Sequence, residues 1–155
     1  MIPLSQVLVV EGRYDKNRLK QIFDAPVVDT GGFGIFNDRE KLALLRRMAE
    51  CCGIIVLTDA DGAGLVIRNF LKGSIGQGRV YQAYIPAMAG KERRKRQPGK
   101  EGLLGVEGMD DSVIIEAVRK SGAMDAPAQP PKKTITKAML YELGLSGGPY
   151  SAQRR

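Results

Sequence analysis

The sequence of 155 residues contains no histidine and only two cysteines. Without histidine, Ser-His-Asp and Cys-His catalysis, zinc sites that need histidine and a histidine general base are excluded. Cys51 and Cys52 are adjacent, too few for a four-sulfur zinc site and unable to form a disulfide framework, which fits a reducing cytoplasm. Any chemistry must therefore use carboxylates, hydroxyls, Lys, Arg or a hard metal ion.

Long apolar runs are also missing. No stretch approaches the ~18 consecutive apolar residues of a membrane span, and residues 1–6 lack the pattern of an export signal. The hydrophobic content of 43% and charged content of 26% are ordinary for a globular protein. We expect an unexported, cytoplasmic protein with one α/β core, a short extra segment and no membrane partner.

Positive charge is in excess and unevenly placed. Lys and Arg number 24 against 17 Asp and Glu, for a net charge of +7. Residues 91–100 carry +5 and residues 132–155 carry +4, which leaves a slightly acidic remainder. Two basic segments on an acidic body favour attraction to nucleic acid phosphates, although a solvated loop or a contact with an anionic membrane would have the same composition.

Short β-branched apolar runs alternate with segments of helical periodicity. The predicted strands are residues 7–10, 26–28, 54–57 and 80–85. Helical spacing is shown by Leu19, Ile22 and Phe23, by Leu42, Leu45, Met48 and Cys52, and by Ile67, Phe70 and Leu71. Asn37 is the expected start of the second helix and Gly53 its end, while residues 30–34 form a glycine loop. The order predicts a parallel sheet with right-handed crossovers.

The pattern changes after Pro86. Residues 87–109 are rich in Gly and Arg and are expected to form a long basic loop, followed by a helix over 113–120. We therefore divide the chain into a domain over 1–122, a linker over 123–133 and a C-terminal region over 134–155. The last region is predicted to contain a helix from Thr136 to Gly144.

Acidic residues follow the first and third predicted strands directly. Glu11 comes after the first strand, and Asp59 and Asp61 come after the third. Ligands of open parallel sheets bind beyond the carboxyl ends of the strands, so neighbouring strands would bring these carboxylates together. Crowded carboxylates repel one another unless a cation such as Mg²⁺ shares them. The alternative is that Asp59 and Asp61 only cap the next helix.

Other acidic or phosphate-binding motifs fit less well. An EF-hand that began at Asp59 would have Phe70 at its twelfth position, where an acid is needed. No P-loop motif occurs, and residues 31–34 do not match a dinucleotide-binding fingerprint. A phosphoacceptor receiver domain also has acids after its first and third strands, but it would leave the basic loop unexplained.

A strand that ends in Glu11-Gly12, with Asp59-x-Asp61-x-x-Gly64 after the third strand, resembles the Toprim domain. The resemblance covers about residues 5–86. It implies a Rossmann-like four-stranded parallel sheet flanked by helices and a metal-dependent action on nucleic acid phosphodiesters. Glu11 would serve as general acid/base, and all three acids would be catalytic and hold one or two Mg²⁺ ions.

Within the Toprim superfamily, the chain is most similar to the 5S ribosomal RNA maturation endonucleases, the ribonuclease M five family. The shared features are Val9-Val10-Glu11-Gly12, residues 59–64 with Arg68, Gly105-Val106-Glu107 and residues 140–155. Members of that family continue past the final Arg pair, so the C-terminal RNA-engaging region would be short or truncated here, as in a short paralogue. The basic insertion is longer than is typical.

The resemblance and the charge pattern together predict a Mg²⁺-dependent endoribonuclease that matures a structured ribosomal RNA precursor, with a ribosomal protein as a candidate partner. The predicted RNA-binding residues are Arg93, Arg94, Lys95, Arg96 and Lys100. Glu107 is a candidate second-site acid. The alternatives are a non-catalytic Toprim-like adaptor that binds RNA or the ribosome and a DNA-acting Toprim protein of the primase or recombination type.

Overall fold

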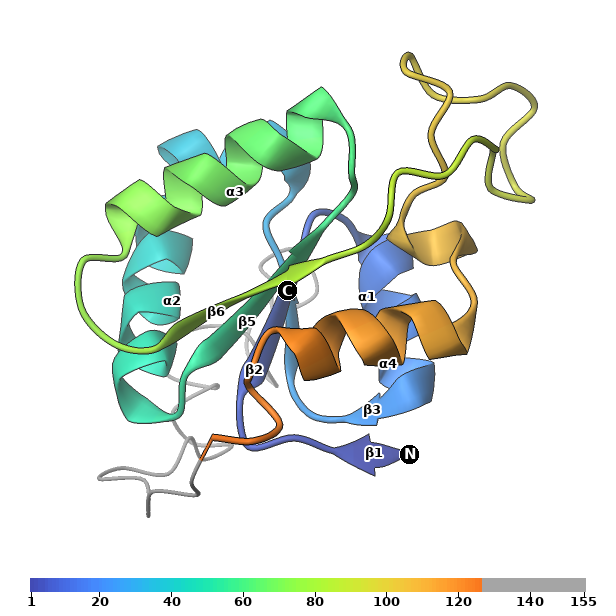
Figure 1. The fold of residues 1–155 in the computed structure, drawn as a ribbon. Coiled ribbons are helices and arrows are strands. Elements are labelled where there is room, and N and C mark those ends of the chain that lie inside the picture. Colours follow the sequence, from blue (N-terminus) through green and yellow to red (C-terminus); the bar gives the residue numbers. More distant parts are fainter. Residues whose placement is uncertain (127–155) are drawn as a thin grey trace, which may run out of the picture.

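The fold is built on a four-stranded parallel sheet in a computed structural model that describes residues 1–126 (Figure 1). The strands are β1 (Ile2–Pro3), β2 (Val7–Val10), β3 (Phe23–Asp24), β4 (Val27–Asp29), β5 (Ile54–Thr58) and β6 (Val80–Tyr84). The helices are α1 (Arg13–Ile22), α2 (Arg39–Cys51), α3 (Gly62–Ser74) and α4 (Asp111–Lys120), with short 3₁₀ helices η1 (Gly32–Asn37) and η2 (Val106–Gly108).

The main sheet has the strand order β4-β2-β5-β6, and all three neighbouring pairs are parallel. Every residue of β2 and β5 is buried, as expected for central strands covered on both faces. The first and third strands of this sheet, β2 and β5, are neighbours, which is the condition under which the acids that follow them meet. Their carboxyl ends meet at one edge of the sheet.

Two hydrophobic clusters cover the two faces of the sheet. Alternate residues of β2 point to opposite faces, so that Leu8 and Val10 pack with α1 and α4. Val7 and Val9 pack with α2 and α3 on the other face. Figure 1 shows the two helix pairs on opposite sides of the sheet. The α/β class with a parallel sheet flanked by helices is confirmed, and it is consistent with the Rossmann-like Toprim fold.

Three local expectations differ from the structure. Phe23 does not continue the first helix but begins β3, which pairs in parallel with β1 in a separate two-stranded sheet. The glycine loop contains η1 from Gly32 onward, after Gly31 adopts a left-handed conformation with φ of 71°. Asp38 rather than Asn37 caps α2, because its side chain accepts a hydrogen bond from the Lys41 N–H.

Residues 87–109 form the expected long connection, with η2 near its end and one isolated bridge between Ala89 and Leu103. The helix predicted over 113–120 is confirmed as α4, with Asp110 at its N-cap. Ala123 is buried against the α1 and α4 side of the core. The rest of the predicted linker, the region 134–155 and its helix lie outside the described residues. No helix within residues 1–126 is long and apolar enough to cross a membrane.

Candidate active site

Glu11 and Asp59 come together where β2 and β5 end. Because the two strands are neighbours, the residues that follow them lie across one crevice, and the Asp59 N–H donates a 2.8 Å hydrogen bond to Oε1 of Glu11. Gly64 packs against this contact. A Cβ at Gly64 would lie 2.7 Å from Oε1 of Glu11 and 2.2 Å from the Asp59 carbonyl oxygen. The glycine of the motif therefore leaves room for the carboxylate.

Asp59 has a second anchor from a distant part of the chain. Its Oδ1 accepts a 2.7 Å hydrogen bond from the N–H of Val106, at the start of η2. Gly105 is required for this approach, since a Cβ there would lie 2.8 Å from the same carboxylate oxygen. Asp59 therefore does not cap α3, as one interpretation of the sequence suggested. Its side chain accepts a hydrogen bond from the Val106 N–H, and its own backbone N–H donates to Glu11, so Asp59 links the loop after the basic segment to the end of β2.

Asp61 does act as a helix cap. It is the N-cap of α3, and its Oδ1 accepts a 2.8 Å hydrogen bond from the Gly64 N–H. It also lies close enough to the other two acids for its charge to raise the pKa of both Glu11 and Asp59. The structure thus brings all three predicted acids to one edge of the sheet and gives Asp61 a structural role in addition.

A fourth carboxylate, Asp15, belongs to the same cluster and was not predicted. It lies in the first turn of α1, is buried, and accepts a 3.2 Å hydrogen bond from the Gly12 N–H. Burial, followed by the charge of Asp59, raises its pKa to about 7. A signal for Asp15 exists in the sequence, because an acid three residues after Gly12 occupies the capping-box position of a helix that starts at the end of a strand.

Burial and mutual repulsion disfavour the charged forms of these acids. The pKa of Glu11 rises to about 7, chiefly through burial and then through the charge of Asp59. Burial also raises the pKa of Asp59, although the Val106 N–H acts in the opposite direction. Acids in this situation are stabilised in their ionised forms when a cation lies among them. The cluster is thus suited to a cation and to acid-base chemistry near neutral pH.

The donor set fits Mg²⁺ rather than a metal that needs a complete protein cage. No group of three or more metal-binding side chains within residues 1–126 is already arranged around one point. Mg²⁺ requires only one or two carboxylates, because it keeps several waters and takes further oxygens from substrate phosphates. Glu11 and Asp59 each use one carboxylate oxygen in the hydrogen bonds given above, which leaves each a second oxygen.

A cavity of about 480 Å³ opens beside Asp59 and Asp61. Arg68 lies in its wall and is buried, with hydrogen bonds to the Ala83 carbonyl at 2.6 Å and to the Gln82 side chain at 2.7 Å. The Arg68 guanidinium also stacks on the ring of Tyr84, 4.1 Å from its centroid. Because its polar groups are satisfied inside the protein, Arg68 supports the cavity wall rather than presenting a free charge.

The five predicted RNA-binding bases are in different environments. Arg94 pairs with Glu107 at 3.0 Å and stacks over the Tyr14 ring at 3.8 Å. Lys95 pairs with the buried Glu92 at 2.9 Å. The remaining three are exposed and make no hydrogen bond or ion pair with residues 1–126: Arg93, Arg96 and Lys100.

Glu107, the predicted second-site acid, lies beside the cluster and is paired with Arg94. Its charge raises the pKa of Asp15, which places it next to the buried carboxylates. Glu107 therefore links the basic segment to the acidic edge of the sheet. Sequence analysis did not single out Glu92, which has a similar linking position: it accepts a 3.0 Å hydrogen bond from the Gly105 N–H, one residue before the amide that binds Asp59.

A parallel sheet with acids gathered at its carboxyl edge and a basic segment beside them defines a Toprim-like site for phosphodiester chemistry. No family model matches the chain. Curated proteins do: ribonuclease M5 of Staphylococcus aureus is 32% identical over 98% of this chain and 78% of its own length. Ribonuclease M5 of Lactiplantibacillus plantarum is 30% identical over 100% of this chain and 77% of its own length. Ribonuclease M5 of Bacillus subtilis is 31% identical over 98% of this chain and 75% of its own length. The chain belongs to the ribonuclease M5 family, which confirms the predicted family and its class of enzyme.

Proposed function

We propose that this protein is a Mg²⁺-dependent endoribonuclease that hydrolyses phosphodiester bonds in structured RNA during maturation of a ribosomal RNA precursor. The observation that carries the proposal is the meeting of Glu11 and Asp59 across β2 and β5, with Asp61 and Asp15 close by. The names of the relatives support RNA cleavage, and the resemblance to 5S ribosomal RNA maturation endonucleases supports the choice of precursor.

In this proposal, Asp59 and Asp61 hold one or two Mg²⁺ ions together with Glu11. The bound metal supplies Lewis-acid polarisation of a phosphoryl oxygen and lowers the pKa of water. In this proposal Glu11 also acts as the general acid/base, and burial and the neighbouring acids, which raise its pKa to about 7 without metal, favour its uptake of a proton. The backbone donors to Glu11 and Asp59 keep both carboxylates oriented.

RNA would be attracted by the exposed members of the basic segment, Arg93, Arg96 and Lys100. Such contacts go to phosphates and carry little base discrimination, so the shape of the RNA would decide where it is cut. A ribosomal protein that holds the precursor in shape is the partner we propose.

The decisive experiment incubates labelled precursor ribosomal RNA with the protein and Mg²⁺, beside Asp59→Asn and Asp61→Asn variants and an EDTA control. Asn replaces Asp well as a helix N-cap, so Asp61→Asn removes the charge while α3 keeps its cap. We expect discrete cuts from the wild type and a loss of at least ~10²-fold in rate for both variants.

Glu116→Gln is the matched control, because Glu116 is an acid on the surface of α4 and, among residues 1–126, pairs only with Arg119 and Lys120 of the same helix. Its rate should equal that of the wild type. RNA that binds without being cut would contradict the nuclease and favour a non-catalytic adaptor. Preferential binding of duplex DNA over duplex RNA of the same sequence would favour a DNA-acting Toprim protein.

A further inference from the structure

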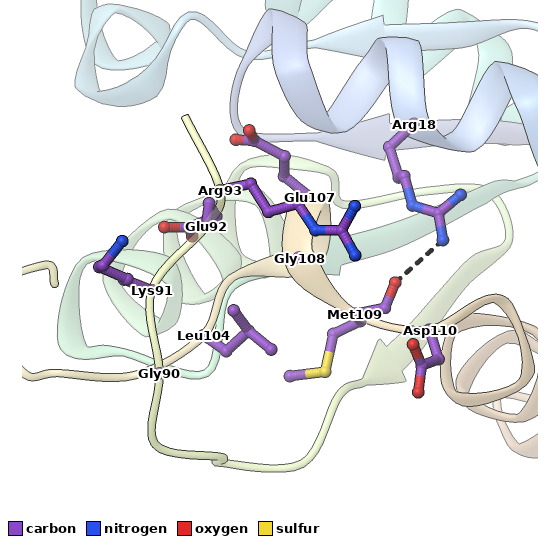
Figure 2. Close-up of a pocket in the computed structure, with 10 residues that line it drawn as sticks. All are labelled: Arg18, Gly90, Lys91, Glu92, Arg93, Leu104, Glu107, Gly108, Met109 and Asp110. Atoms are coloured by element: carbon purple, nitrogen blue, oxygen red, sulfur yellow. Dashed lines mark hydrogen bonds between the residues drawn. The ribbon is translucent and has the colours of Figure 1, made fainter. Parts of the chain in front are cut away.

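A second pocket, of about 510 Å³, is lined by residues of the loop that anchors Asp59 and by residues of the basic segment (Figure 2). Consecutive amides of this loop bind two neighbouring carboxylates. The Val106 N–H donates to Asp59 in the acid cluster, and the Gly105 N–H donates to Glu92, which lines the second pocket. Glu92 lies close enough to Asp59 for its charge to raise the pKa of Asp59, so the pocket adjoins the acid cluster.

Two guanidinium groups from distant parts of the chain enter this pocket. Figure 2 shows the side chains of Arg18, from α1, and Arg93, from the basic segment, both turned into it, with Leu104 and Met109 across from them. The Nη2 group of Arg18 donates to the Met109 carbonyl at 3.0 Å and pairs with Asp111, which holds the side chain in place. Its Nε and Nη1 groups, and the whole guanidinium of Arg93, have no partner within residues 1–126.

Arg18 is paired with Asp111, whereas no acid of the pocket pairs with Arg93. Glu92 is engaged by Lys95 and by the Gly105 amide, and Glu107 is engaged by Arg94. Asp110 is exposed at the N-cap of α4, where the helix dipole stabilises its charge. Two guanidinium groups that face one pocket repel each other unless an anion lies between them, and their planar forks match the oxygens of a phosphate.

We propose that Arg18 and Arg93 form a clamp for one backbone phosphate of the substrate RNA, on a nucleotide that flanks the bond to be cut. This inference rests on the proposed function, since it takes RNA as the ligand. The acid cluster repels the RNA backbone, and a fixed pair of guanidinium groups beside it offsets that repulsion and sets the position of the strand. The clamp is a defined site, unlike the exposed bases Arg96 and Lys100.

Methylphosphonate interference tests the clamp without cleavage. A synthetic RNA duplex that copies the cleavage region carries one neutral methylphosphonate at each position in turn, and binding is measured in EDTA. In the wild type, a methylphosphonate at one position should weaken binding by about tenfold, because it removes one charge-assisted contact. That position is the sensitive position. The Arg93→Gln variant should bind the unmodified RNA about tenfold more weakly than the wild type does, and a methylphosphonate at the sensitive position should not weaken its binding further.

Arg96→Gln is the matched control, since Arg96 is an exposed Arg of the same segment outside the pocket. A methylphosphonate at the sensitive position should still weaken the binding of RNA to this variant by about tenfold. Arg18→Lys keeps the charge and the pairing with Asp111 but loses the planar fork, so it should also lose most of the effect without removing the link to α4. Equal interference in the wild type and in Arg93→Gln would overturn the clamp.

Inorganic phosphate provides an independent readout through the NMR signals of the Arg Nε–H groups. Millimolar phosphate, but not chloride at the same ionic strength, should shift the signals of Arg18 and Arg93 and leave that of Arg96 unchanged. Shifts with free phosphate but no position-specific interference in RNA would overturn the proposal in favour of a free-phosphate site. Interference without any cleavage in Mg²⁺ would support the clamp and contradict the nuclease.

Discussion

The acidic edge of the sheet and the basic segment over residues 91–100 are held in different ways. Glu11 and Asp59 follow fully buried strands and accept hydrogen bonds from backbone amides. The basic segment has no regular secondary structure, and its contacts are ion pairs of side chains such as Arg94 with Glu107. One isolated bridge, between Ala89 and Leu103, closes the connection in which it lies.

This difference separates the requirements of chemistry from those of binding. Carboxylates that act on one bond must keep their positions, and burial of two neighbouring strands provides that rigidity. Exposed ion pairs contribute only about 0–1 kcal/mol each, so the part of the basic segment that does not pair with the buried Glu92 can adjust to the shape of an RNA at little cost. The loop at Gly105 and Val106 joins the two regions, because its consecutive amides donate hydrogen bonds to Glu92 of the basic segment and to Asp59 of the acidic edge.

Among the tests of this comparison, the largest effect is expected for Gly64→Ala, which tests the rigidity of the acidic edge. The new methyl group would overlap the Asp59 carbonyl oxygen and Oε1 of Glu11, so the backbone or the carboxylate must move. We expect a loss of about 1–3 kcal/mol in the free energy of unfolding and at least ~10-fold in cleavage rate. Urea unfolding and single-turnover cleavage measure the two effects.

Gly34→Ala is the control for this substitution, because a Cβ at Gly34 would meet no atom within 4 Å. It should leave stability and rate close to those of the wild type. If Gly64→Ala behaved like Gly34→Ala, the acidic edge would be as adaptable as the basic segment, and the comparison would fail.

An intermediate effect is expected from pH, because Glu11 and Asp15 both have their pKa raised to about 7 in the folded protein. Unfolded carboxyls titrate near pH 4, so the folded state holds more protons between about pH 4 and pH 7. Stability in EDTA should therefore fall as the pH rises through this window. These two groups alone should lower the melting temperature by about 5 °C between pH 5 and pH 8.

Asp59→Asn removes a charge that raises both pKa values, so it should flatten this dependence. Added Mg²⁺ should raise the melting temperature of the wild type at pH 8 far more than at pH 5, where protons occupy the acids. Equal stabilisation by Mg²⁺ at both pH values would show that the metal binds elsewhere.

The smallest effect is expected within the basic segment and concerns the salt dependence of RNA binding. Arg96→Gln should lower the slope of log affinity against log salt by about one, because Arg96 is free to neutralise a phosphate. Arg94→Gln should lower it by less, since Glu107 already neutralises Arg94. Equal changes in the two slopes would mean that an RNA phosphate displaces Glu107 from Arg94, so that the ion pair between Arg94 and Glu107 is lost when RNA binds.

Much of this site could be predicted from local patterns. The β-branched runs at 7–10 and 54–57 predicted two buried strands, and the acids directly after them predicted a shared crevice. Asp15 escaped prediction because its position in a first helical turn is typical of an ordinary capping residue. The pairing of β1 with β3 escaped because each strand has only two residues, too few to show a period.

The sequence by itself determined where the four strands of the main sheet and the four α-helices of residues 1–126 lie and which acids follow the strand ends, because these features depend on neighbours a few residues away. Only the tertiary structure decided that the Val106 amide binds Asp59, that Arg94 and Lys95 are paired while Arg93 is free, and that Arg93 shares a pocket with Arg18. Those contacts join residues 47 to 75 positions apart in the chain, apart from the ion pairs of Arg94 and Lys95 within the basic connection. They depend on how the long connection folds back over the edge of the sheet, which no local pattern encodes.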